Sequence, residues 1–150
     1  MNTVRPFESP AAGAFVLRVA LGLMWLSHAI VLKVMTFGMT NLAAWLGTQG
    51  FSPLLAYPLV AAEVIGGVLI LVGFHGRWAS GLLLPVLIGA ITVHAGNGWV
   101  FTSPNGGWEY PLFLIAASLA HFFVGDGALA LRPTAGSMPA LARSPQARSA

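Results

Sequence analysis

The residues of this sequence that could do chemistry are ionisable side chains within long apolar stretches or at their ends. An ionisable group at the centre of a bilayer costs about 2.5–3.5 kcal/mol on insertion scales, so such groups are expected to face a helix-bundle interior and pair. The plainer alternative is that they only lock helices together or reach toward the lipid headgroups. The set comprises Arg18, His28, Glu63, His94, Glu109 and His121.

Depth along the apolar stretches sorts these side chains, at a rise of about 1.5 Å per residue. We expect an outer group near one membrane face and a deeper group that forms a buried ionic network. The outer group contains His28, Lys33, His94, Asn97 and Glu109. The deeper group contains Arg18, Glu63 and His121.

The outer group suits proton-coupled chemistry on a quinone headgroup. The carbonyl oxygens of a quinone need hydrogen-bond donors, and its reduction needs protons from groups that titrate near neutrality. His28 and His94, at similar depth on different helices, could instead ligate a haem iron. Histidine has several commoner uses, so neither haem nor another metal is the expectation, and the outer group predicts a ligand site.

Glu63 lies near the centre of its apolar stretch and therefore needs a partner. At 100° per residue, Arg18 and Lys33 lie about 60° apart around one helix, so both could look into a bundle interior. We expect Arg18 to pair with Glu63, because its long side chain can span the difference in depth and the pair lowers the cost of both charges. A carboxylate at this depth is also a candidate proton relay or ligand contact.

Membrane-spanning helices must hold these side chains. Hydrophobic residues make up 57% of the 150 residues and charged residues only 7%, against about 25% charged in a soluble domain. Four apolar stretches have roughly the 17–25 residues that a span needs, at about 12–34, 54–74, 78–96 and 108–124. The predicted fold class is all-α, a transmembrane four-helix bundle.

The segments outside the spans divide into loops and termini. Apolar residues at roughly helical spacing indicate that the first outer loop could hold a short helix on the membrane interface; they are Phe37, Leu42, Trp45, Leu46 and Phe51. We expect a cytoplasmic N-terminal segment over 1–11, the transmembrane domain over 12–131, and a disordered cytoplasmic tail over 132–150.

Basic residues predict the orientation. Both termini and the turn near residue 76 share one side of a four-span bundle, and that side carries Arg5, Arg77, Arg132, Arg143 and Arg148. The opposite loops contain no Lys or Arg. The positive-inside rule therefore places both termini in the cytoplasm.

The cysteine count is zero. Disulfides, thiolate metal sites and cysteine-ligated iron–sulfur clusters are therefore excluded for this chain. The basic residues form no run with interleaved aromatic residues, so a nucleic-acid partner is not expected either. A redox role would need a bound cofactor or a partner protein.

Three segments resemble the DoxX family of small membrane proteins. The first is Leu17–Ala29, with Arg18 and Gly22 before His28; many members have glycine where Ser27 stands. The second is Ala62–Gly73, similar to the Glu-x-x-Gly-Gly segment of the family. The third joins His94–Trp99 to Gly106–Pro111. Together they span about Phe15–Leu131.

The resemblance implies a four-helix protein of the bacterial cytoplasmic (inner) membrane. Relatives are linked to quinone-coupled oxidation, including a subunit of a thiosulfate:quinone oxidoreductase, and to oxidative-stress complexes. No thiosulfate-binding module is recognisable here. The resemblance directs attention to the outer group, Arg18 and Glu63, but it implies no catalytic mechanism.

The leading hypothesis is a DoxX-like protein that binds a quinone or a similar lipid-soluble ligand within a membrane redox assembly. It could be a subunit of a quinone-linked oxidoreductase, with a protein partner and further copies of itself as candidate neighbours in the bilayer. One alternative is a non-catalytic membrane anchor or accessory subunit of a partner enzyme. A second is a haem-binding, cytochrome-like protein.

Overall fold

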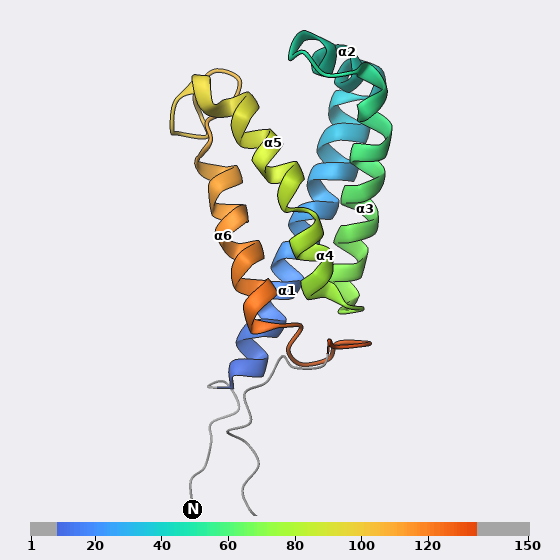
Figure 1. The fold of residues 1–150 in the computed structure, drawn as a ribbon, viewed down its shortest axis with the longest axis vertical. Helices are drawn as coiled ribbons and strands as arrows, with labels where there is room; N and C mark the ends of the chain where they lie inside the picture. Colours follow the sequence, from blue (N-terminus) through green and yellow to red (C-terminus); the bar gives the residue numbers. More distant parts are fainter. Residues whose placement is uncertain (1–8, 135–150) are drawn as a thin grey trace, which may run out of the picture.

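The computed structural model describes residues 9–134, and their regular structure is helical (Figure 1). Helix α1 (Pro10–Leu26) runs directly into the π-helix η1 (Ser27–Phe37). After α2 (Met39–Thr48), a short 3₁₀ turn, η2 (Pro53–Leu55), leads into α3 (Ala56–Val72). Next come α4 (Gly76–Leu82), α5 (Leu84–His94), the 3₁₀ turn η3 (Ala95–Asn97) and α6 (Glu109–Val124). The predicted all-α class is confirmed.

Three helical stretches are long and apolar enough to cross a membrane: Pro10–Phe37, Pro53–Val72 and Gly76–Asn97. The fourth, α6, has 16 residues and is shorter but equally apolar in character. This arrangement is that of a helical membrane bundle. The helix expected in the first outer loop is also present as α2, which buries Leu42 and Leu46 against the bundle.

Proline and serine set several helix starts. Ser9 caps α1 by accepting a hydrogen bond from the Ala12 amide at 3.1 Å, and Pro10 follows as the first helical residue. Pro58 and Pro111 lie in the first turns of α3 and α6. Proline is tolerated in a first turn because the amide hydrogen it lacks would have no partner within the helix.

The helices form two arms that meet at one end of the molecule (Figure 1). One arm pairs α1 and η1 with α3; the other pairs α6 with α4 and α5. The arms meet where α1 begins, which we call the terminal end: it also holds the 73–76 turn and the segment 125–134. They diverge toward the loop end, which holds α2 and the loop 98–108.

Glycines fix the register between α1 and α3. A Cβ on Gly22 would lie 2.7 Å from the Leu71 Cβ and 2.8 Å from the Leu71 backbone, so only glycine allows this approach. About one turn away along α3, Gly67 packs against Trp25 and Leu26 of α1. Small residues at such contacts are what membrane helices use to pack closely.

The third apolar stretch is broken between α4 and α5. Leu83 lies outside both helices, with φ −86° and ψ −8°, and Pro85 is among the first residues of α5. A proline removes one backbone hydrogen bond and crowds the carbonyl four residues earlier, which ends or kinks a helix. The break lets α4 pack on α6 near the terminal end while α5 continues to the loop end.

Candidate functional site

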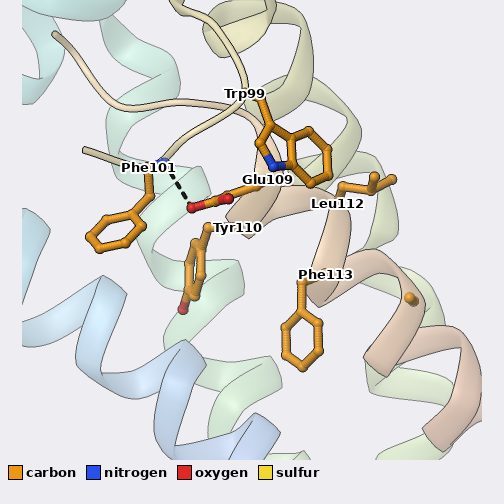
Figure 2. Close-up of a pocket in the computed structure, with 7 residues that line it drawn as sticks. Trp99, Phe101, Glu109, Tyr110, Leu112 and Phe113 are labelled. Atoms are coloured by element: carbon orange, nitrogen blue, oxygen red, sulfur yellow. Dashed lines mark hydrogen bonds between the residues drawn. The ribbon is translucent and has the colours of Figure 1, made fainter. Parts of the chain in front are cut away.

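An open groove at the loop end is the candidate site (Figure 2). Its volume is about 540 Å³, and its walls come from the 98–108 loop and the first half of α6. The lining residues are Trp99, Phe101, Glu109, Tyr110, Leu112, Phe113 and Ala116. The side chains of these residues are apolar apart from the Glu109 carboxylate, the Tyr110 hydroxyl and the indole nitrogen of Trp99. This is the usual pattern of a ligand site, an apolar cleft with a few placed polar groups.

Glu109 is held in the groove wall by the loop. Its Oε1 accepts a hydrogen bond from the Phe101 amide at 2.8 Å, and its own amide donates to the Trp99 carbonyl at 3.0 Å. Figure 2 shows the carboxylate between Trp99 and Tyr110. The loop therefore fixes the side chain through Oε1 and leaves Oε2 without a hydrogen bond from residues 9–134.

His28 lies behind the groove, on Tyr110. The two rings stack with centroids 5.0 Å apart and planes 17° apart. The Tyr110 hydroxyl lies 3.4 Å from His28 Nδ1, at the outer limit of a hydrogen bond. The predicted site residue His28 thus contacts Tyr110, a residue that lines the groove with Glu109 and that the sequence interpretation did not single out.

His94 and Asn97 hold the loop rather than line the groove. His94 Nδ1 lies 3.0 Å from the Asn105 carbonyl and 3.2 Å from the Gly106 carbonyl. Asn97 donates its amide hydrogens to the same two carbonyls, at 3.2 and 3.0 Å. The His94 ring also lies against Trp45 of α2, with centroids 6.5 Å apart. These two residues position the loop that carries Trp99 and Phe101.

The predicted pairing of Arg18 with Glu63 is wrong. Glu63 pairs with Lys33, which the sequence interpretation placed in the outer ligand group. The Glu63 side chain is only 2% exposed and the Lys33 side chain 21%. Lys33 therefore serves as the counter-charge of a buried carboxylate between η1 and α3.

Helix register explains this difference. Gly22 lies beside Leu71 in an antiparallel pair, so Arg18 lies level with the turn near His75. At 1.5 Å per residue, Glu63 is about 18 Å further along the axis of α3, beyond the reach of an arginine side chain. Lys33 does face the bundle interior as expected, from the π-helical segment η1.

Arg18 instead binds the segment that follows α6. Its Nη1 donates to the Asp126 carbonyl at 3.0 Å and its Nη2 to the Leu129 carbonyl at 3.3 Å. The guanidinium occupies the space beside Gly73, where a Cβ would lie 2.2 Å from Nη1. Gly73 ends α3 in the left-handed conformation, with φ +69°. Arg18 thus ties the segment 125–134 to the terminal end of the bundle.

Asp126 is the functional-looking residue that the sequence interpretation missed. It is fully buried, its Oδ1 accepts from the Arg77 amide at 2.9 Å, and the same oxygen lies 3.5 Å from His121 Nε2. His121 Nδ1 in turn lies 2.7 Å from the Ser80 hydroxyl. The sequence did offer one indication of its importance: acidic residues are rare, and Asp126 is one of only four in the chain.

The Ser80–His121–Asp126 arrangement has the residue types of a nucleophile, base and orienting acid. All three side chains are 0% exposed. No substrate atom can reach the serine hydroxyl. The cluster is therefore structural, and it joins α4, α6 and the segment after α6. The predicted deeper network is therefore divided: His121 and Arg18 lie around Asp126, and Glu63 lies apart with Lys33.

Within residues 9–134, no group of three or more His, Cys, Asp or Glu side chains has the arrangement that holds a metal ion. His28 and His94, weighed as haem ligands, are each engaged at Nδ1 by a different neighbour. The loop-end groove places one carboxylate in an aromatic cleft.

Comparison with known proteins places this architecture in a family. A family model described as DoxX matches residues 13–95, which is more than half of the chain. This chain belongs to the DoxX family. The resemblance seen in its motifs is thereby confirmed, and the chain is an integral membrane protein. The matched range of the DoxX model runs from within α1 to the end of α5, so α6 and all the lining residues of the groove lie beyond it.

One curated DoxX-like relative extends across the groove region. The Bacillus subtilis (strain 168) protein named "Putative oxidoreductase CatD" is 34% identical over 122 residues, which is 81% of this chain and 85% of the relative. No solved structure matches this chain.

Proposed function

We propose that this DoxX protein binds a quinone, or a lipid-soluble aromatic ligand of the same kind, in the loop-end groove and serves a membrane redox assembly. The single observation that carries the proposal is the Glu109 carboxylate in the wall of an otherwise apolar, largely aromatic groove of about 540 Å³. A flat ring with polar oxygens and an apolar tail is the ligand class that matches such walls.

The aromatic side chains supply the faces on which a ring can stack. Trp99 and Tyr110 flank the carboxylate, and Phe113 lies further along α6 (Figure 2). Offset or edge-to-face contacts between aromatic rings are worth about 0.5–1.5 kcal/mol beyond the buried area. Leu112 and Phe113 are 39% and 68% exposed on the membrane-facing surface of α6, so an isoprenoid-like tail can leave toward the lipid.

Glu109 supplies the polar contact and the proton exchange. Reduction of a quinone to a quinol takes two electrons and two protons, and re-oxidation releases them. Phe101 holds Oε1, so Oε2 is the atom that can donate a proton to, or accept one from, a ring oxygen. The Tyr110–His28 pair lies directly behind as a second polar group.

The electrons must come from elsewhere. The chain has no cysteine for thiol chemistry, so a partner protein or a cofactor bound to it is the donor in this proposal. The name of the B. subtilis relative describes an oxidoreductase, which is consistent with this role. In the orientation expected from the basic residues, with both termini in the cytoplasm of a bacterial inner membrane, the groove opens toward the outer leaflet.

Equilibrium binding of a short-chain benzoquinone to the protein in lipid nanodiscs tests the proposal. Phe113→Ala should weaken binding about fivefold, because an aromatic contact is lost. Glu109→Ala should weaken it by a similar factor through the lost hydrogen bond. Glu109→Gln, which keeps both an acceptor for Phe101 and a donor for the ligand, should bind within about twofold of wild type.

The matched control is Phe37→Ala. Phe37 is an exposed aromatic residue near the loop end that does not line the groove, so its removal should leave quinone affinity unchanged. Absence of quinone binding by the wild-type protein, or equal weakening by Phe37→Ala and Phe113→Ala, would contradict the proposal and favour the anchoring role.

A further inference from the structure

A second groove lies between α4 and α6 near the terminal end. Its volume is about 310 Å³. The lining residues are Trp78, Gly81, Leu82, Leu84, Leu119, Phe122 and Phe123. Leu82 is 79% exposed and Phe123 is 72% exposed, so the groove faces outward from the bundle. Every lining residue is apolar apart from the indole nitrogen of Trp78.

One cation lies against the rings of this groove. The Arg77 guanidinium carbon is 5.2 Å from the centroid of the Phe122 ring and 5.8 Å from that of Trp78. Among residues 9–134, no carboxylate forms an ion pair with the Arg77 side chain, and its buried Nε has no hydrogen-bond partner. Within the described residues, a guanidinium without an ion-pair partner therefore stands at one end of an apolar trough.

The position along the bundle matches a lipid. Arg77 is the second residue of the Gly76–Asn97 stretch, so it lies where that apolar stretch meets the polar terminal end. From Trp78 to Leu84 the groove follows the chain away from that end for about 9 Å, at 1.5 Å per residue. Trp78 has the amphipathic ring that membrane proteins place at the headgroup level.

We propose that this groove binds one anionic phospholipid, with its headgroup phosphate at Arg77 and one acyl chain along the trough. An arginine guanidinium binds phosphate through paired, charge-assisted hydrogen bonds, and basic pockets between membrane helices are known to take anionic headgroups. A lipid with net negative charge supplies a counter-charge to the guanidinium, whereas a zwitterionic lipid brings its own cation. This site is independent of the quinone proposal.

Native mass spectrometry of the full-length protein, released from mixed phosphatidylglycerol and phosphatidylcholine micelles, tests the site. The wild-type protein should retain one phosphatidylglycerol, and Arg77→Gln should lower that retention at least fivefold. Arg77→Lys, which keeps the charge but not the fork of donors, should retain an intermediate amount. Arg132→Gln is the matched control, because Arg132 is an exposed cation at the same end that also lies over an aromatic ring, that of Phe74.

A second pair of variants tests the trough without touching the charge. Leu82→Trp should obstruct the groove and lower phosphatidylglycerol retention, whereas Ile65→Trp, at a 60% exposed position of α3 outside the groove, should not. Because Leu82 is mostly exposed, this variant should fold even if Arg77→Gln does not, and far-ultraviolet circular dichroism checks both.

Three results would overturn the site. The first is equal retention of phosphatidylcholine and phosphatidylglycerol by the wild-type protein. The second is loss of phosphatidylglycerol in Arg132→Gln or Ile65→Trp to the same extent as in their partners. The third is displacement of the lipid by glycerophosphoglycerol at equal concentration, which would mean that the phosphate alone is bound and the trough is not used.

Discussion

Glu63 and Lys33 form an ion pair between the middle of α3 and the last turns of η1. Removing one member of a buried pair leaves the other charge without compensation, which typically costs about 3–5 kcal/mol, whereas replacing both members costs much less. The Lys33 side chain is 21% exposed, which places the expected cost at the lower end of that range.

We therefore expect Lys33→Gln to lower the free energy of unfolding by about 3 kcal/mol, as measured by titration with sodium dodecyl sulfate in mixed micelles. The double variant Lys33→Gln/Glu63→Gln should recover at least half of that loss, because two amides can hydrogen-bond to each other. Arg132→Gln, at an exposed position, is the control and should change little. A double variant no more stable than the single one would refute the pairing.

The types of the important residues could be predicted at this scale, but not their partners. The apolar surroundings of Arg18, Glu63 and His121 correctly indicate burial, because a bilayer segment forces ionisable groups inward. Partner choice depends on helix register, which the sequence of one helix does not contain. Asp126 was missed because it follows α6 in a segment with no apolar pattern.

At the scale of elements, the contact between α1 and α3 sets the helix register and so decides which charged residues can pair. Gly22 permits it, since its missing side chain leaves room for the Leu71 backbone. Gly13 lies earlier in the same helix with nothing within 4 Å of where its Cβ would be. Comparing an alanine substitution at each of these two glycines therefore separates the effect of helix propensity from that of packing.

Gly22→Ala should lower the free energy of unfolding by about 1–3 kcal/mol, as overpacking does. Gly13→Ala should leave it unchanged or raise it by up to about 1 kcal/mol, because alanine is the better helix former. The same detergent titration measures both variants. Equal effects of the two substitutions would mean that α1 and α3 do not approach at Gly22.

Sequence patterns predict the elements better than their internal geometry. Apolar length indicates the spans, and the spacing of Leu42 and Leu46 indicates the helix α2. The π-helical winding of η1 and the break at Leu83 change which faces the helices present. Pro85 is a visible signal for the break, whereas nothing in the apolar run Ser27–Phe37 distinguishes π from α winding.

At the scale of the whole molecule, the terminal end and the loop end of the bundle differ in structure. The terminal end is closed by backbone hydrogen bonds: the Leu131 and Arg132 amides donate to the carbonyls of Val72 and Gly73, at 3.1 and 3.0 Å. The loop end carries the groove around Glu109. The candidate site at the loop end and the closed terminal end are therefore separate parts of one bundle.

The site as a whole could be predicted only in outline. Glu109 and the aromatic loop are adjacent in sequence, which favours a ligand site there. His94 and Asn97 hold the loop in place by hydrogen bonding to the carbonyls of the Asn105–Gly106 turn. This contact forms only when the loop folds, so the sequence does not reveal it. The stack of His28 on Tyr110 joins α1's π-helical extension to α6 across the bundle and has no sequence signal at all.

Photo-crosslinking with an azido-quinone, followed by peptide mapping, tests the central claim most directly. In wild-type protein in nanodiscs, the label should attach within residues 99–116, and an excess of unlabelled quinone should abolish it. Glu109→Ala and Phe113→Ala should lower this labelling about fivefold, in step with the lost contacts. Labelling spread evenly over the lipid-facing helices, or labelling that excess quinone does not displace, would contradict a quinone site in the loop-end groove.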